Sequence, residues 1–143
     1  MEGRQSVYDS ERKQPTIFLL EEDDATRKVL MQNLRTCGYR VIASTDEEDA
    51  LERVSDGRVQ ADLVLVNLVG KPLEELLGVG RKVRERARFD GNTPLVVMPE
   101  KYGKDVEGKE DNVCGNDWVF YLGEEPQQLQ NFLIRLLPVS SPA

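Results

Sequence analysis

Acidic and amide side chains follow two apolar segments of the chain, at points where strands of a parallel sheet would end. Four consecutive acids, 21 to 24, come directly after the apolar run 17 to 20, and Asn67 comes directly after the run 63 to 66. Polar groups just past the carboxyl ends of parallel strands lie at the edge where open α/β sheets place their sites. Carboxylates can bind a hard divalent cation such as Mg2+ together with retained waters. The sequence therefore indicates a candidate metal corner.

The four acids also have a purely structural explanation. Negative charge is favourable near the N-terminus of a helix, and a helix-patterned segment follows directly. This explanation suffices for Glu21 and Asp24, whereas we expect Glu22 and Asp23 to contribute to the metal corner with Asn67.

Short apolar runs alternate along the chain with segments of helical periodicity. This alternation predicts βαβ crossovers and hence an α/β fold, a doubly wound five-stranded parallel sheet flanked by about five helices. The expected strands are Thr16 to Leu20, Tyr39 to Ala43, Leu63 to Val66, Pro94 to Met98 and Trp118 to Leu122. The expected helices are Ala25 to Cys37, Asp46 to Val54, Leu73 to Ala87 and Pro126 to Leu137, with a short or irregular fourth helix within Glu100 to Gly115.

The length of 143 residues fits one domain, which we place at residues 15–137. Residues 1–14 are polar without periodicity, and residues 138–143 contain two prolines and cannot continue a helix. Both ends are therefore expected to be tails.

Composition excludes several classes of function. The absence of histidine removes Ser-His-Asp and Cys-His nucleophile systems and histidine-ligated metals. The formal charge of −7 argues against a nucleic-acid-binding surface, and we interpret the basic stretch 81–88 as a solvated helix face, with a docking patch as the alternative. Two isolated cysteines, no signal-peptide pattern and no apolar segment near the length of a membrane span predict a cytoplasmic protein.

The chain resembles the receiver domains of bacterial two-component response regulators, the CheY-like family with a flavodoxin-like sheet. The segments that carry the resemblance, in the family's order and spacing, are Ile17 to Arg27, Gly38 to Val41, Ala61 to Leu68, Thr93 to Met98 and Gly115 to Trp118. The family takes a phosphoryl group from a histidine kinase onto an aspartate.

The resemblance assigns a role to five positions. Glu22 and Asp23 fall on the family's metal-binding acids, and Asn67 falls on its phosphoacceptor. Pro99 stands where the family has a hydroxyl residue, and Tyr121 stands where it has a lysine. A carboxamide cannot form an acyl phosphate, proline has no hydroxyl, and tyrosine has no ammonium group. Phosphorylation by the family's route should therefore fail, and Mg2+ affinity should be weak or lost.

We accordingly expect a stand-alone pseudo-receiver, not an enzyme, that needs no cofactor and acts through protein contacts. The family's output face implies another signalling protein or a second copy as the partner, with no nucleic acid and no membrane. In this chain that face comprises the fourth helix, fifth strand and fifth helix, at Lys101 to Gly115, Asp117 to Leu122 and Pro126 to Leu137.

Two alternatives stay open. The first is a phosphorylatable receiver with another acceptor such as Asp62, although this residue begins its strand and so lies at the opposite edge. The second is a small-molecule binder or enzyme on a flavodoxin-like sheet. Four acids in the first loop would repel a phosphate there, and a phosphatase of the haloacid dehalogenase type would want aspartate where Glu21 precedes Asp23.

Overall fold

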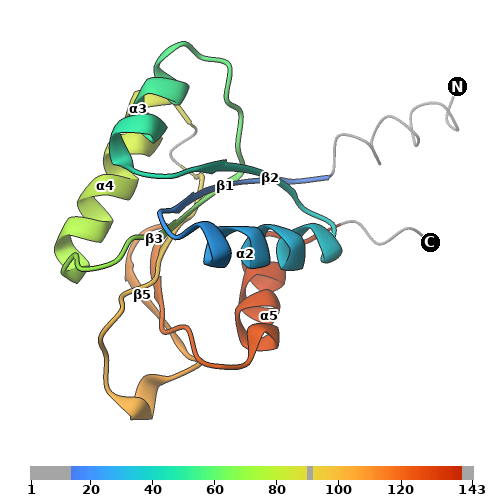
Figure 1. The fold of residues 1–143 in the computed structure, drawn as a ribbon, viewed down its shortest axis with the longest axis vertical. Helices are drawn as coiled ribbons and strands as arrows, with labels where there is room; N and C mark the ends of the chain where they lie inside the picture. The colour runs from blue at the N-terminus through green and yellow to red at the C-terminus, as the bar shows by residue number, and fades with distance from the viewer. Residues whose placement is uncertain (1–13, 90–91, 140–143) are drawn as a thin grey trace, which may run out of the picture.

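A computed structural model describes residues 14–89 and 92–139. Within these ranges the chain forms a six-stranded sheet in the order β2-β1-β3-β4-β6-β5, flanked by four α-helices (Figure 1). The strands are β1 (Thr16–Glu21), β2 (Arg40–Ser44), β3 (Leu63–Asn67), β4 (Leu95–Val97), β5 (Glu110–Cys114) and β6 (Asp117–Phe120). The helices are α2 (Asp24–Thr36), α3 (Glu47–Ser55), α4 (Leu73–Arg86) and α5 (Pro126–Leu136), with a short 3-10 helix η1 (Lys104–Val106).

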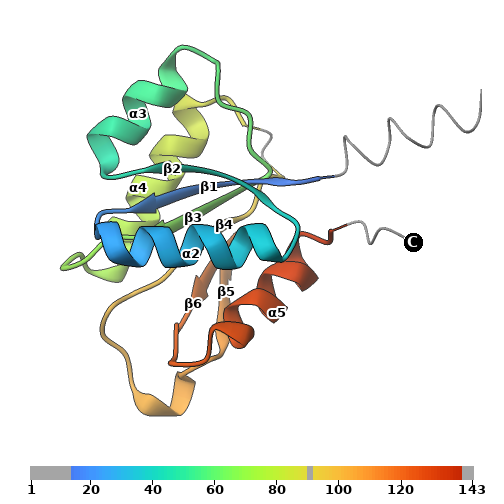
Figure 2. The same cartoon turned by 45° about the vertical axis from the view of Figure 1, so that its right-hand side comes forward.

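The sheet has one helical layer on each face. Helices α3 and α4 pack together on one side, and α2 and α5 cover the other (Figure 2). Strands β1, β3 and β4 lie in the middle of the sheet and are parallel to their neighbours. Because both of their faces are covered, these strands consist of continuous apolar residues, as parallel strands generally do.

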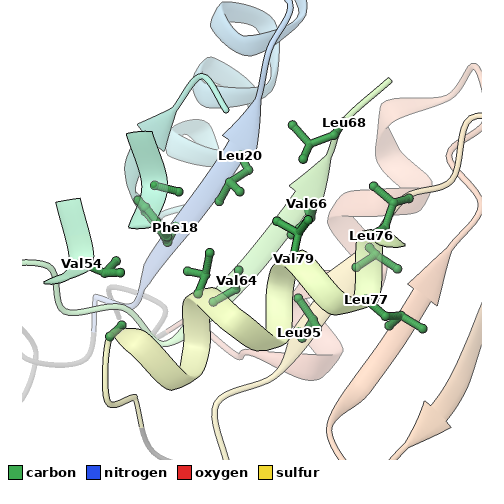
Figure 3. Packing of buried hydrophobic residues seen from close by; sticks show 14 of the residues in the cluster. Phe18, Leu20, Val54, Val64, Val66, Leu68, Leu76, Leu77, Val79 and Leu95 are labelled. Carbon is green, nitrogen blue, oxygen red and sulfur yellow. The ribbon is translucent and has the colours of Figure 1, made fainter. Parts of the chain in front are cut away.

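Two hydrophobic clusters, one on each face, fill the space between the sheet and the helices. The α3/α4 cluster joins the even-numbered side chains of β1 and β3, such as Phe18 and Val64, to Leu76 and Val79 of α4 (Figure 3). The α2/α5 cluster joins the odd-numbered side chains of the same strands to the inner sides of α2 and α5. The alternation of side chains along each strand therefore divides one apolar run between two cores.

Local signals fix the ends of the helices that lead into the sheet. The Asp46 carboxylate caps α3 by accepting from the backbone N–H of Asp49 at 2.8 Å. Gly38 follows α2 with a φ of 102°, a conformation that side chains disfavour, and turns the chain into β2. These signals set the connections that bring the carboxyl ends of β1 and β3 to one edge.

The doubly wound, CheY-like α/β sheet predicted from the sequence is confirmed, with one change of detail. The segment expected to hold a short or irregular fourth helix forms η1 and then β5, a sixth strand antiparallel to β6. The physical reason is that this segment has no apolar stripe to bury as a helix, while it can form backbone hydrogen bonds to an existing strand. The described residues therefore contain four α-helices and six strands.

The expected tails fall mostly outside the described residues. Residues 1–13 and 140–143 are not described, whereas Val139 packs against the α2/α5 cluster. Within the described ranges, the structure contains no helix with the length and apolar content to cross a membrane.

Candidate functional site

Glu21 and Asn67 are the last residues of the neighbouring strands β1 and β3, and the parallel register places them side by side. The amide nitrogen of Asn67 donates a hydrogen bond to Oε1 of Glu21, and the backbone N–H of Asp23 donates to Oε2 at 3.1 Å. The Glu21 side chain is buried, at 1% exposure. Burial raises the pKa of Glu21 above its usual value, and the two hydrogen bonds oppose this rise.

The two acids expected at the metal corner each accept a backbone hydrogen bond. Glu22 Oε1 accepts a hydrogen bond from the backbone N–H of Val69 at 2.6 Å, which ties the loop after β3 to the loop after β1. Asp23 is the N-cap of α2, and its carboxylate accepts from the backbone N–H of Thr26 at 2.8 Å. This hydrogen bond lowers the pKa of Asp23. The structure therefore joins Asn67 to Glu21 by a hydrogen bond and places Asp23 in the lining of the same cavity, whereas Glu22 is not among the described residues that line it.

The donor atoms at this corner do not fit a preformed Mg2+ site. Both carboxylate oxygens of Glu21 already accept hydrogen bonds, and Glu22 and Asp23 each hold a backbone N–H. Mg2+ demands near-octahedral oxygen ligands at short distances. Among the described residues there is no group of three or more acidic, cysteine or histidine side chains placed to hold a metal ion.

A cavity of about 450 Å³ opens over the Glu21–Asn67 pair. Its walls include Pro99 and Glu100 from the loop after β4, and Tyr102 from further along that loop. The Tyr102 hydroxyl donates to the backbone carbonyl of Leu122, which closes the loop onto the end of β6. The cavity thus presents the Asn67 amide, the buried carboxyl of Glu21, two exposed carboxyls and a proline ring, with no cationic side chain among the described residues that line it.

The two remaining predicted positions lie in different surroundings. Pro99 borders this cavity. Tyr121 does not line it. The Tyr121 ring packs against Tyr102 with centroids 5.4 Å apart, and its hydroxyl donates to Asp111 Oδ2 at 2.8 Å. This contact and burial raise the pKa of Tyr121, with burial the larger cause. Tyr121 therefore belongs to the contact between β6 and β5.

Sequence reasoning missed Glu21 and Tyr102 as members of the site. Glu21 was interpreted as a helix N-terminal acid, although it completes β1 and the helix begins at Asp24. The signal was available: pairing Ile17 with Leu63 and counting four residues along both strands places Glu21 opposite Asn67. Tyr102 carried no such signal because it lies in an irregular loop.

The basic residues of the stretch 81–88 are exposed, as predicted for a solvated face, except the half-buried Arg84, and three of them also pair with acids. Arg81 Nε lies 2.7 Å from Oδ2 of the buried Asp117, and an Arg84 guanidinium nitrogen lies 2.8 Å from its Oδ1. Lys82 pairs with Glu47 at 2.8 Å. These three cations hold α4 to β6 and to α3. A buried acid at the start of β6 explains why part of this face turns inward.

The alternative acceptor Asp62 lies at the opposite edge of the sheet from Asn67, as expected. Its carboxylate accepts a hydrogen bond from the backbone N–H of Thr16, at the beginning of β1, at 2.8 Å. It therefore serves as a local link between the starts of β1 and β3.

Comparison with known proteins shows what the fold of this chain is similar to. No protein-family model matches the chain. The chain is 30% identical over 82 residues to the Two-component response regulator-like APRR3 of Arabidopsis thaliana, which is 57% of this chain and 16% of that protein. The chain thus spans a small part of that relative's length.

Three solved structures illustrate the likeness in fold. A response regulator receiver protein from Sinorhizobium medicae superposes with a TM-score of 0.64 at 20% identity, covering 86% of this chain and 94% of that one. The response regulator TrrA from Thermotoga maritima, solved with Mg(2+)-BeF, gives 0.62 at 17%, covering 86% and 99%. The receiver domain of a Pseudomonas aeruginosa sensor histidine kinase, with magnesium in its active site cleft, gives 0.59 at 22%, covering 86% and 97%. The fold is that of a receiver domain.

Proposed function

We propose that this chain is a receiver-like signalling domain of the two-component type that does not accept a phosphoryl group and acts through contacts with another protein. It has no catalytic turnover and requires no cofactor. Asn67 carries the proposal, because it ends β3 at the position where the resemblance places the phosphoacceptor, and it donates a hydrogen bond to Glu21. A carboxamide has no carboxylate oxygen to attack phosphorus.

The surroundings of Asn67 support the same proposal. The acids that the resemblance assigns to Mg2+ are occupied by the backbone N–H groups of Val69 and Thr26. Each acid uses one carboxylate oxygen for this hydrogen bond, so Mg2+ would have to share the group with a backbone donor, which should weaken its affinity. A phosphoryl group would in addition meet no cationic side chain from the described residues that line the cavity.

The coupling groups that would transmit a switch are also altered. Pro99 borders the cavity without a hydroxyl that could follow a phosphoryl oxygen. Tyr121 holds Asp111 on the neighbouring strand instead of reaching the cavity. These contacts support a contact surface that does not change with phosphorylation. Signalling would then depend on whether the partner protein is present.

Intact-mass spectrometry after incubation with acetyl phosphate and Mg2+ tests the proposal directly. We expect no mass gain of a phosphoryl group, and no saturable change of Trp118 fluorescence when beryllofluoride is added with Mg2+. Trp118 is a suitable reporter because its ring packs edge-on against Phe132, with centroids 5.6 Å apart, between β6 and α5.

The matched variants for this experiment are Asn67→Asp and Asp62→Asn. A phosphoryl adduct on the wild type would overturn the proposal. If Asp62→Asn removed such an adduct, the acceptor would be at the start of β3 despite its distance from Asn67. An adduct that appears only with Asn67→Asp supports the proposal, because it identifies the amide as the block.

A further inference from the structure

Strand β5 is an edge strand in a segment that the sequence pattern predicts as a helix. It pairs with β6, and in the described part of the chain no strand pairs with its other side (Figure 2). Residues 111–114 are exposed. An edge strand presents a row of backbone N–H and C=O groups that can pair with a strand of another chain.

The direction of the backbone groups follows from one hydrogen bond at the start of β5. The backbone N–H of Tyr121 donates to the carbonyl of Lys109 at 3.0 Å, so Lys109 directs its carbonyl toward the neighbouring strand. Alternate residues of an antiparallel pair direct their backbone groups to the same side. Asp111 therefore also faces β6, whereas Glu110 and Asn112 direct their N–H and C=O groups outward.

Side-chain contacts on both faces hold this edge in place without a partner. Glu110 Oε1 lies 2.7 Å from an Arg135 nitrogen of α5, and Asp111 accepts from the Tyr121 hydroxyl on the opposite face. The Asn112 amide donates to the carbonyl of Gly115 at 2.9 Å and so stabilises the turn into β6. A strand that is ordered beforehand pays less conformational entropy on binding.

The charge around this edge favours a basic partner. Among residues 104–114, the exposed acids Asp105, Glu107 and Asp111 and the half-buried Glu110 outnumber the two exposed lysines, 104 and 109. A second copy would bring the same acids into proximity, which is unfavourable. A lysine- or arginine-rich extended segment would meet them favourably, and its backbone would accept hydrogen bonds from the outward N–H groups of β5 and donate to its outward carbonyls.

We propose that β5 binds an extended basic segment of another protein as an added strand. Pairing is limited to the region of Glu110 to Asn112, because a register irregularity between Asn112 and Cys114 interrupts the edge. Backbone hydrogen bonds supply affinity in this mode, and side chains supply specificity. The inference rests on the proposed function, since it names the kind of partner through which the domain acts.

Amide hydrogen exchange of the full chain tests the binding mode, with a synthetic peptide of alternating lysine and valine as the probe. At saturating peptide, exchange of the Glu110 and Asn112 amides should slow by about tenfold or more, because they become hydrogen-bonded. The Asp111 amide, which already faces β6, should change less. Binding without slowing at Glu110 and Asn112, or no binding, would overturn the inference.

Glu110→Pro and Glu110→Ala form a matched pair for the backbone contribution. Both remove the ion pair with Arg135, but only proline also removes the outward N–H, and an edge strand tolerates proline where its N–H faces solvent. We expect the proline variant to bind the peptide about tenfold more weakly than the alanine variant. Equal affinities would overturn strand addition, and the exchange result on the wild type decides if the proline variant does not fold.

Further outcomes separate a basic partner from a non-basic partner and from a second copy of this chain. A peptide with glutamate in place of lysine should bind much more weakly, and equal binding would overturn the choice of a basic partner. A dimer in solution with Glu110 and Asn112 protected in the absence of peptide would identify a second copy as the occupant and overturn the inference. Phosphorylation of the chain would contradict the proposed function without changing the exchange result at β5.

Discussion

The side-chain amide of Asn67 donates a hydrogen bond to Oε1 of Glu21, its partner in the register of β3 and β1. Glu21 is a buried carboxyl group whose second oxygen is held by the backbone N–H of Asp23. An ionised carboxylate only accepts hydrogen bonds, so the nitrogen of the amide must face it. Asn67 therefore supplies a hydrogen-bond donor to a buried acid, whereas the carboxylate of an aspartate at this position would repel that acid.

Asn67→Asp should convert this pair into one that depends on a divalent cation. Without Mg2+, the loss of the amide donor and the repulsion between two carboxylates should lower the free energy of unfolding by roughly 1 to 3 kcal/mol. Mg2+ at about 100 times its Kd should return about 2.7 kcal/mol. Denaturant unfolding followed by Trp118 fluorescence, with and without Mg2+, measures both effects.

The control for this experiment is Asn67→Ala, which removes the donor without adding a charge. It should lose stability without gaining a response to Mg2+. If Asn67→Asp unfolded at the same denaturant concentration with and without Mg2+, the carboxylate pair would not form a cation site. A full, switch-like response of Asn67→Asp to acetyl phosphate would show that Pro99 and Tyr121 do not block coupling.

Glu21→Gln should stabilise the protein at neutral pH and flatten the dependence of its stability on pH. Burial raises the pKa of Glu21 above 4.5, so the folded state holds this proton more tightly than the unfolded state. The contribution of Glu21 to the free energy of unfolding should consequently fall as pH rises from 4.5 through the folded-state pKa of this group. Glutamine is neutral over this whole pH range, and it can still form a hydrogen bond with Asn67 once the two side-chain amides are oriented donor to acceptor.

Urea unfolding of the wild type and of Glu21→Gln across this pH range measures the difference. Glu100→Gln is a suitable control, because Glu100 lines the same cavity but is exposed to solvent. Its substitution also removes one carboxyl group but leaves the hydrogen bonds of Glu21 in place. The same slope in the wild type and in Glu21→Gln would show that the buried carboxyl does not titrate differently in the folded state.

The central layers of the fold could be predicted from the sequence because each buried strand reads as an apolar run. The helix expected from Leu73 to Ala87 is observed as Leu73–Arg86, and the strand expected to end at Val66 extends by one residue to Asn67. Apolar runs and helical periodicity are properties of the local sequence, and they indicate which segments become buried strands and helices in the fold.

Strand β5 and the role of Glu21 could not be predicted in this way. The residues of β5, Glu110–Cys114, are polar and gain their strand conformation by pairing with β6, which is a tertiary contact. Glu21 has the local pattern of a helix N-terminal acid, and only its register with Asn67 reveals that it is buried beside an amide. In both cases a neighbouring strand, and not the local sequence, decides the structure.

Asp23→Ala should destabilise helix α2 without changing cation binding. Asp23 accepts from the backbone N–H of Thr26, which lowers its pKa, so its contribution is present at neutral pH and is lost as pH falls through that lowered value. The melting temperature at neutral pH should fall by more than for Asp24→Ala, whose exposed carboxylate pairs with Arg27. The difference should shrink in acid.

The same substitution in the Asn67→Asp background separates a helix cap from a metal ligand. If Asp23 only caps α2, the Kd for Mg2+ should be the same with and without Asp23→Ala. A large loss of Mg2+ affinity would show that Asp23 leaves Thr26 and turns to the cation when a second carboxylate is present.

Arg84→Ala should cost far more stability than Arg86→Ala on the same helix. Arg84 forms an ion pair with the buried Asp117, 2.8 Å from its Oδ1, and donates a hydrogen bond to the carbonyl of Thr93 at 3.1 Å, whereas Arg86 is exposed. Losing a charged hydrogen-bond donor there should lower the free energy of unfolding by roughly 1.5 to 3 kcal/mol. The exposed substitution should stay within about 0.5 kcal/mol.

A double-mutant cycle with Asp117→Asn identifies which contact carries this cost. The substitutions Arg84→Ala and Asp117→Asn should show a coupling free energy of at least about 0.5 kcal/mol, because each substitution removes the ion-pair partner of the other residue. Arg81 also pairs with Asp117, at 2.7 Å, so part of the cost of removing the acid should remain in the Arg84→Ala background. If Arg84→Ala and Arg86→Ala lowered the free energy of unfolding by equally small amounts, the ion pair with Asp117 would not contribute to stability. The whole stretch 81–88 would then behave as the solvated face predicted from its charges, and helix α4 would not depend on Asp117 for its position against β6.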